Sequence, residues 1–480
     1  MDTFGKQMKE SRSRITPTPH AWQEDKFEIP NSETRIASST LASDTRGVGG
    51  SAGIGVSCGR GCFGLGPELG REGGGGAFRV RLHRAKHCVA LWGNGDHGRL
   101  GLSSASSSNA ASRWEPTVCE SLAELEPIAV ACGGAHTLVL TDEGRVLATG
   151  LNDHGQLGAE QLDTHQSQFV EVVRGLPSRC VHIAAGYNHS GAITDDGAVY
   201  VWGSNAHGQL GLGKKAEKLV HDPTRVEALR GIRVKKLALG AEHSLALSED
   251  GDVLSWGNGS SGRLGHGRQS GPLRFFGNST EFLPRLVDFF REIRIHDIAA
   301  GLMHSACVDF YGVVYTFGNG RMCQLGNGSS RGDIPEPGAL ALPAARQVAC
   351  GGYHTGAVTR LGDLYMCGSN ENGCLGFGYK HTDPARFPMK VEGPLTTQNV
   401  LEVACGWKHS CALTDKGQLF AWGWGGAEGS YSSDGRSGGG QLGLGNEFDF
   451  NEPTLVPVKS MKGVQVSCGF NHTAAIFKEC

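Results

Sequence analysis

The sequence predicts an all-β fold, a seven-bladed β-propeller closed by pairing of its N- and C-terminal strands. Three observations predict it. A Gly-x-x-His-Ser/Thr motif occurs seven times, with histidines spaced by 53, 54, 61, 50, 55 and 63 residues. A second motif, close to Gly-x-Leu-Gly, recurs in phase with the first, and short β-forming runs that end at glycine lie between them. A period of about 50 residues is typical of an array of one supersecondary unit.

Each unit reads as strand, turn, strand and then a glycine-punctuated loop. In the second unit, residues 183–185 lead to a glycine, 189–193 form the histidine strand, Asp196-Gly197 turns the chain, 198–202 return and 205–211 leave the sheet. Asp-Gly pairs between apolar strands are hairpin turns, because glycine accepts a positive φ. No stretch shows a sustained helical period, so we expect no helix in the core. Radial repetition of such small antiparallel sheets gives a propeller.

The two ends of the array predict how the ring closes. Residues 89–93 match the late strand of a unit and lack the early one, whereas residues 466–477 match the early part and lack the late strand. The two halves together make one blade. Their pairing leaves no open sheet edge.

The recurring histidines are interpreted as structural. A ring with one histidine per blade does not bring three or four ligands within about 2 Å of one metal ion. A catalytic site needs to exist only once, whereas a buried imidazole in every blade can link neighbouring strands or blades by hydrogen bonds. The structural repeat histidines are His136, His189, His243, His304, His354, His409 and His472.

Other repeated positions also indicate packing. Four of the 15 cysteines, Cys132, Cys350, Cys405 and Cys468, precede the glycine of the histidine motif, where the other repeats have alanine or leucine. A position that accepts all three residue types is a packing position. This cysteine usage, with an odd total, packing positions and no Cys-x-x-Cys pair, favours a reducing compartment without a disulfide framework. The tryptophans at the ends of the late strands are expected in the core: Trp92, Trp202, Trp256 and Trp422.

Composition divides the chain into two regions. Residues 78–480 are expected to form the propeller, and residues 1–77 a disordered or targeting region that is glycine-rich at 47–76. The formal net charge of −3 argues against a general polyanion-binding surface. No apolar run of about 18 residues exists, so we expect no membrane insertion.

No nucleophile–base pair, paired carboxylates or phosphate loop occurs outside the repeats, so we expect no catalytic, cofactor or metal site and favour a binding scaffold over an enzyme. Recognition is expected in the irregular insertions at 266–282, 327–340 and 425–439, because loops on a rigid scaffold commonly carry it. The candidate partner-binding loop offers Glu428, Tyr431, Asp434 and Arg436.

The paired motifs from Val89 to Phe477 resemble the regulator of chromosome condensation repeat family, which implies a seven-bladed propeller. Within that family, a chromatin-bound exchange factor for a small nuclear GTPase implies nucleotide exchange as the alternative function. The plant ultraviolet-B receptor implies photoreception, but its Gly-Trp-Arg-His-Thr repeats have one near match here, Gly406-Trp407-Lys408-His409-Ser410. One tryptophan cannot build a cluster of coupled indoles, so photoreception is the least favoured alternative.

A plant mitochondrial member of the family resembles the chain more closely. The resemblance rests on 350–355, 368–376, 404–409, 422–426 with the insert that follows, 261–267 and 467–475. It implies that the chain binds protein partners, and that it binds RNA either directly or through splicing factors. The implied role is intron splicing of mitochondrial transcripts and biogenesis of respiratory-chain complex I. The resemblance also implies a mitochondrial location. Mitochondrial targeting segments are poor in acidic residues, whereas the N-terminal region of this chain contains acids such as Glu10 and Asp25. A location in the cytoplasm or nucleus is therefore the alternative.

Overall fold

The computed structural model describes residues 86–102, 111–159, 163–172, 175–267, 280–329, 332–426 and 438–479. The chain divides into two units, residues 1–79 and 80–480, and every described residue belongs to the second. The expectations for residues 1–77 therefore lie outside the described residues.

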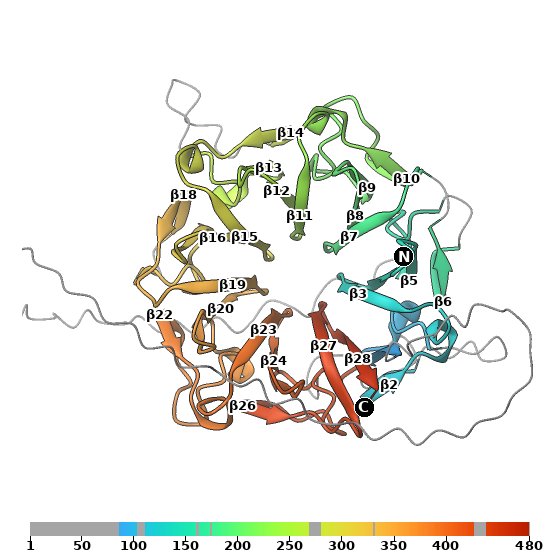
Figure 1. The fold of residues 1–480 in the computed structure, drawn as a ribbon. Helices are drawn as coiled ribbons and strands as arrows, with labels where there is room; N and C mark the ends of the chain where they lie inside the picture. Colours follow the sequence, from blue (N-terminus) through green and yellow to red (C-terminus); the bar gives the residue numbers. More distant parts are fainter. Residues whose placement is uncertain are drawn as a thin grey trace, which may run out of the picture. The chain divides into compact units, whose positions relative to one another are not determined.

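The second unit consists of seven four-stranded antiparallel sheets arranged around an axis (Figure 1). This confirms the predicted seven-bladed propeller. The innermost strands of the blades are β3 (Pro127–Cys132), β7 (Cys180–Ala185), β11 (Val234–Leu239), β15 (Ile295–Ala300), β19 (Ala345–Cys350), β23 (Val400–Cys405) and β27 (Met461–Cys468). The second strands, each beginning at a repeat histidine, are β4 (His136–Thr141), β8 (His189–Thr194), β12 (His243–Ser248), β16 (His304–Asp309), β20 (His354–Thr359), β24 (His409–Thr414) and β28 (His472–Glu479).

The outer half of each blade contains a third and a fourth strand. The third strands are β5 (Val146–Leu151), β9 (Val199–Ser204), β13 (Val253–Gly257), β17 (Val314–Asn319), β21 (Leu364–Gly368), β25 (Leu419–Gly423) and β1 (His87–Gly93). The fourth strands, at the rim in Figure 1, are β6 (His165–Glu171), β10 (Leu219–Arg225), β14 (Glu281–Leu286), β18 (Asp333–Ala339), β22 (Ala385–Lys390), β26 (Phe450–Leu455) and β2 (Arg113–Val118).

The closing blade has the strand order β2-β1-β28-β27, so two N-terminal strands pair with two C-terminal strands. Trp92 lies opposite Thr473 and Gly93 opposite His472 in the β1–β28 register. The predicted closure by terminal strands is therefore confirmed.

Helices contribute little within the described residues, where they are short 3-10 turns at strand connections. These are η1 (Asp96–Gly98), η2 (Glu120–Leu122), η3 (Glu227–Leu229), η4 (Ser260–Gly262), η6 (Asp288–Phe290), η7 (Glu371–Gly373) and η8 (Gly393–Leu395). The expectation that helices do not build the core is borne out.

The glycine of each histidine motif provides the space in which the imidazole packs. A Cβ atom added to Gly240 would lie 2.3 Å from Cε1 of His243, three residues along the chain. Gly257, at the end of β13, has a φ of +102°, and a Cβ atom there would lie 2.8 Å from the Cα atom of His243. Two glycines in each blade are thus required by one histidine.

Apolar residues from adjacent blades form a shared core. Trp256 of β13 is fully buried against Val201 and Leu210 of the preceding blade. Its indole Nε1 donates a 2.8 Å hydrogen bond to the main-chain oxygen of Gln209 in that blade. The four tryptophans expected in the core have no exposed surface. Neighbouring blades therefore stabilise each other by face-to-face packing.

Candidate interaction faces around the propeller axis

The propeller has two faces, which differ in the loops that they carry. The motif face carries the Gly-x-x-His loops between the first and second strands, together with the Gly-x-Leu-Gly segments. The hairpin face carries the tight turns between the second and third strands, such as Asp196-Gly197. Each innermost strand runs from the hairpin face to the motif face.

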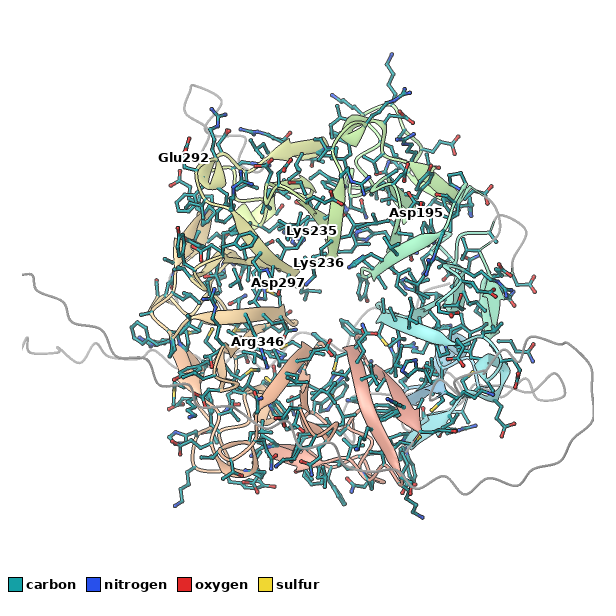
Figure 2. All side chains as sticks on the ribbon, in the orientation of Figure 1. Asp195, Lys235, Lys236, Glu292, Asp297 and Arg346 are labelled. Carbon is teal, nitrogen blue, oxygen red and sulfur yellow. The ribbon has the colours of Figure 1, made fainter. Side chains whose placement is uncertain are left out.

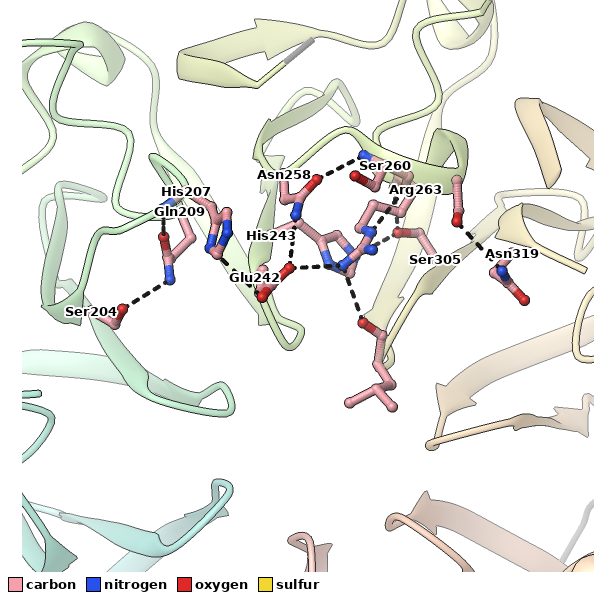
Figure 3. Close-up of polar contacts among 12 residues, drawn as sticks. Ser204, His207, Gln209, Glu242, His243, Asn258, Ser260, Arg263, Ser305 and Asn319 are labelled. Carbon is pink, nitrogen blue, oxygen red and sulfur yellow. Dashed lines mark hydrogen bonds and ion pairs between the residues drawn. The ribbon is translucent and has the colours of Figure 1, made fainter. Parts of the chain in front are cut away.

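Each repeat histidine links its own blade to the next. All seven imidazoles are fully buried, and each Nε2 atom lies 2.9–3.1 Å from the hydroxyl oxygen that follows the next blade's histidine. Figure 3 shows this contact for His243 and Ser305, where the distance is 2.9 Å. The series closes on itself, because His472 reaches Thr137 at 2.9 Å.

The hydroxyl groups extend this link to the second repeated motif. Ser305 Oγ donates a 2.8 Å hydrogen bond to the main-chain oxygen of Arg263 in the preceding blade. Because that bond uses the hydroxyl hydrogen, the imidazole Nε2 must carry the proton that joins it to the hydroxyl oxygen. Burial lowers the pKa of His136, His189, His304 and His409 to about 3. The imidazoles are therefore neutral near pH 7.

A polar network fixes the motif face between the blades of β12 and β16 (Figure 3). Glu242 accepts a 2.7 Å hydrogen bond from Asn258 Nδ2 and lies 3.7 Å from the buried guanidinium of Arg263. Arg263 also donates from Nε to the main-chain oxygen of Ser260 at 2.9 Å and from Nη1 to that of Leu302 at 3.4 Å. This arginine therefore joins its own blade to the next one.

A cavity of about 130 Å³ lies on the axis at the motif face. Its wall includes the cysteine, alanine or leucine that ends each innermost strand and the glycine that follows. Burial raises the pKa of the Cys350, Cys405 and Cys468 thiols well above the ordinary value. These groups therefore remain thiols and pack as small apolar side chains.

An aromatic cluster borders this cavity. The Trp407 ring stacks on Phe470 with centroids 4.2 Å apart, and Tyr187 meets Phe470 edge-on at 5.3 Å. Trp424 lies perpendicular to Trp407 at 5.6 Å, so the structure contains an indole pair where the sequence motif indicated one indole. Lys408 Nζ lies 4.8 Å from the Trp407 centroid and 2.6 Å from a Glu371 carboxylate oxygen.

A second ring of residues, which was not predicted from the sequence, lies along the innermost strands. Its members stand seven positions before each repeat histidine, and this spacing is the signal that could have found them. They are Ala129, His182, Lys236, Asp297, Gln347, Glu402 and Gln465. Lys236 and Asp297 form an ion pair near the axis (Figure 2).

Four of these side chains bind the main chain of the next blade's innermost strand. Gln347 donates to the Val403 oxygen at 2.9 Å and accepts from its N–H at 2.8 Å, and Gln465 contacts Val130 at 3.3 and 2.8 Å in the same way. In addition, Asp297 accepts from Val348 N–H at 3.0 Å and Glu402 from Val466 N–H at 3.3 Å. These contacts satisfy main-chain groups at an otherwise unpaired sheet edge.

Glu402 has the most unusual environment of this ring. Burial raises its pKa to about 7, an effect opposed by the hydrogen bond from Val466 and by the charge of Lys236. The carboxyl group is therefore partly protonated near neutral pH.

The predicted recognition loops are only partly described. Glu428, Tyr431, Asp434 and Arg436 lie outside the described residues, as do residues 268–279 of the insertion at 266–282. Within the described residues, no group of three or more His, Cys, Asp or Glu side chains could hold a metal ion, and no helix is long and apolar enough to span a membrane.

Comparison with known proteins agrees with this architecture. The chain is similar to the ultraviolet-B receptor UVR8 of Arabidopsis thaliana, with 34% identity over 391 residues that cover 79% of this chain and 81% of the receptor. It is also 30% identical over 395 residues to the human E3 ubiquitin-protein ligase HERC2, covering 81% of this chain and only 8% of that protein.

Solved structures show the same arrangement of blades. Human WBSCR16 is 25% identical with a TM-score of 0.69, covering 82% of this chain and 99% of that one. Prp20p of Saccharomyces cerevisiae, described with its binding to Gsp1p and histones, is 25% identical with a TM-score of 0.71, covering 82% and 92%. Residues 88–475 match the model of the RCC1-like domain. The chain therefore belongs to the RCC1-like domain family.

Proposed function

We propose that this protein is a non-catalytic scaffold that binds protein partners in mitochondria. In this role it supports intron splicing of mitochondrial transcripts and, through them, biogenesis of respiratory-chain complex I. One observation carries the scaffold role: the repeat histidines are buried, neutral and bonded to neighbouring blades. The repeats thus build a rigid ring whose two faces remain available for recognition.

The organelle role is supported by the resemblance of several motif stretches, including 404–409 and 467–475, to a plant mitochondrial member of the family. The net charge of −3 favours contact with RNA through partner proteins over a broad direct RNA interface, because phosphate binding depends on Lys and Arg side chains. We therefore expect splicing factors as the immediate partners, with RNA recovered alongside them.

Affinity purification of the full chain from isolated mitochondria tests this role. Mass spectrometry of bound proteins and sequencing of bound RNA should recover splicing factors and intron-containing transcripts. RNase treatment before capture should leave the protein partners bound. Fractionation that places the chain outside mitochondria, or recovery without any splicing factor, would contradict the organelle role.

Nucleotide exchange on a small GTPase is the second candidate. It is favoured by the structural similarity to Prp20p, whose described partner is Gsp1p. The test is release of a fluorescent guanine nucleotide from a panel of purified small GTPases in the presence of the full chain. Acceleration for one GTPase would favour exchange, and unchanged release for all of them would favour the scaffold.

A further inference from the structure

All seven blades contain a β-bulge at the same place on the innermost strand. The pairing between the first and second strands shifts register eight positions before each repeat histidine. A bulge leaves one residue outside the ladder and redirects its side chain. The bulged residue is the one that precedes each member of the polar ring, at the hairpin end of the strand.

The bulged residues are segregated around the ring into two continuous arcs. Four consecutive blades, those of β23, β27, β3 and β7, carry the apolar arc of Leu401, Val464, Ile128 and Val181, which are 43, 47, 41 and 51% exposed. The remaining three blades, those of β11, β15 and β19, carry the basic arc of Lys235, His296 and Arg346. Figure 2 shows Lys235 on β11 and Arg346 on β19, the innermost strands of the two blades that flank the β15 blade.

The charge of the basic arc is not cancelled by the carboxylates beneath it. Asp297 is paired with Lys236 and accepts a hydrogen bond from Val348, so its charge is already matched. Burial raises the pKa of Glu402 to about 7, which reduces its negative charge near neutral pH. An acidic ligand at the mouth of the axis would therefore find Lys235 and Arg346 as cationic partners.

An aromatic hairpin extends the basic arc outward. Phe310 lies 5.7 Å from Lys235 Nζ and its ring is 5.6 Å from that of His296. With Tyr311 it forms a turn that is 52 and 83% exposed, and Leu361 in the next blade's turn is 84% exposed. Aromatic side chains are enriched in protein interfaces.

We propose that this bulge ring, defined by the four apolar-arc and three basic-arc residues, binds one segment of a partner protein, and that this segment has one apolar side and one acidic side. The apolar side chains of the segment lie on the apolar arc, and its carboxylates lie on the basic arc. Aliphatic side chains at four of the seven positions offer contacts to apolar side chains. Asp142 and Asp195 lie on the hairpins of the β3 and β7 blades, within the apolar arc. They disfavour an RNA backbone, which is negatively charged along its whole length, whereas the proposed segment places its carboxylates only on the basic arc. These features favour a protein segment over RNA.

This inference deepens the scaffold role and rests on it, but its test needs neither mitochondria nor RNA. A displayed library of random 16-residue peptides is selected on the full chain, and the enriched peptides are synthesised and titrated by fluorescence anisotropy. We expect peptides that combine Asp or Glu with Leu, Ile or Phe. Their affinity should fall as salt is raised, because exposed charges are screened.

Two variants locate the binding surface. Lys235→Glu/Arg346→Glu reverses the basic arc, and Val181→Ser/Val464→Ser weakens the apolar arc while leaving Arg346 and its contact with the Val400 oxygen intact. Each should weaken peptide binding about tenfold or more. The control Lys416→Glu, on the hairpin of another blade, should leave binding unchanged, and thermal unfolding confirms that each variant is folded.

Four outcomes would overturn the proposal: no enriched peptide, peptides without an excess of acidic residues, binding that both arc variants retain, or single-stranded poly(U) RNA that binds to these residues in place of peptides. If affinity purification from mitochondria recovers no splicing factor but the selected peptides still bind, only the organelle role is rejected. If the purification recovers splicing factors but no peptide binds to the bulge ring, only this docking surface is rejected.

Discussion

The Nε2 atom of His243 lies 2.9 Å from the hydroxyl oxygen of Ser305 in the next blade, and that hydroxyl donates to the main-chain oxygen of Arg263. One imidazole thus couples both repeated motifs across a blade boundary. The same three-part link recurs around the ring and closes between His472 and Thr137. A network of this kind makes the histidines contributors to stability.

Replacing His243 with alanine should lower the free energy of unfolding by roughly 1–3 kcal/mol, because a buried hydrogen bond is lost and its hydroxyl partner is left unsatisfied. Chemical denaturation measures the change. The matched control is His207→Ala, whose side chain is 44% exposed and should contribute little. Unaltered stability together with loss of one specific binding activity would contradict the structural role.

The histidines should also make the propeller sensitive to acid. Burial lowers the folded-state pKa of His136 and His304 to about 3 from an ordinary value of 6.5, so the unfolded chain binds more protons between these values. Stability should therefore decline as pH falls below about 6.5, by about 1.4 kcal/mol per pH unit for each such histidine. Denaturation at a series of pH values tests the sign, and His136→Gln should reduce the slope.

The recurring features were predictable because recurrence marks positions that every blade requires. Gly240 and His243 form such a pair, since the imidazole occupies the space that a Cβ atom on Gly240 would need. The fourth strand of each blade was not anticipated. In β10 the strand is only partly buried, contains Pro223, and pairs with β9 through a register shift, so it shows no regular alternation.

The polar and bulge rings were not anticipated either, because their residue types differ from blade to blade. Asp297 and Glu402 occupy equivalent positions yet share no chemistry with Ala129. Their common feature is the β-bulge beside them, which appears only when the strands are paired. The loop that contains Tyr431 stays a prediction, since it lies outside the described residues.

Glu402→Gln should stabilise the protein by roughly 1–2 kcal/mol at pH 8. The folded-state pKa of about 7 exceeds the ordinary 4.5, so the contribution of Glu402 to stability falls as pH rises between these values. Glutamine carries no charge and can make the paired contact with Val466 that Gln347 makes with Val403. The gain should shrink at pH 5. The reverse change, Gln347→Glu, should lower the free energy of unfolding at pH 8. If each substitution changed the free energy of unfolding by the same amount at pH 5 and at pH 8, this account would be excluded.

Ultraviolet-B illumination should leave the oligomeric state unchanged, despite 34% identity to UVR8. Trp407 stacks on Phe470 and has Trp424 as its indole neighbour, whereas the equivalent positions of the other blades carry no tryptophan. Size-exclusion chromatography before and after irradiation measures this for the native protein and for Trp407→Phe. A light-dependent shift from dimer to monomer in the native protein would restore photoreception as a candidate.

Removal of the insertion that follows β25 should separate recognition from folding. The residues that flank it are already close together: Gly440 N–H donates a 2.8 Å hydrogen bond to the Gly425 oxygen, and a Cβ atom on Gly426 would lie 2.3 Å from the Gly439 Cα atom. A short turn can therefore join residues 426 and 438. Shortening a loop changes its closure entropy by only about 0.6 kcal/mol for each twofold change in length.

Replacing residues 427–437 with a three-residue glycine-serine turn should thus leave the melting temperature nearly unchanged. If Glu428, Tyr431, Asp434 and Arg436 contact a partner, recovery of that partner from mitochondrial extract should fall. Peptides selected for the bulge ring should bind the shortened protein with unchanged affinity, because that ring lies at the hairpin end of the innermost strands. Undiminished recovery of every partner would reject a role for this loop and direct attention to the insertion at 266–282.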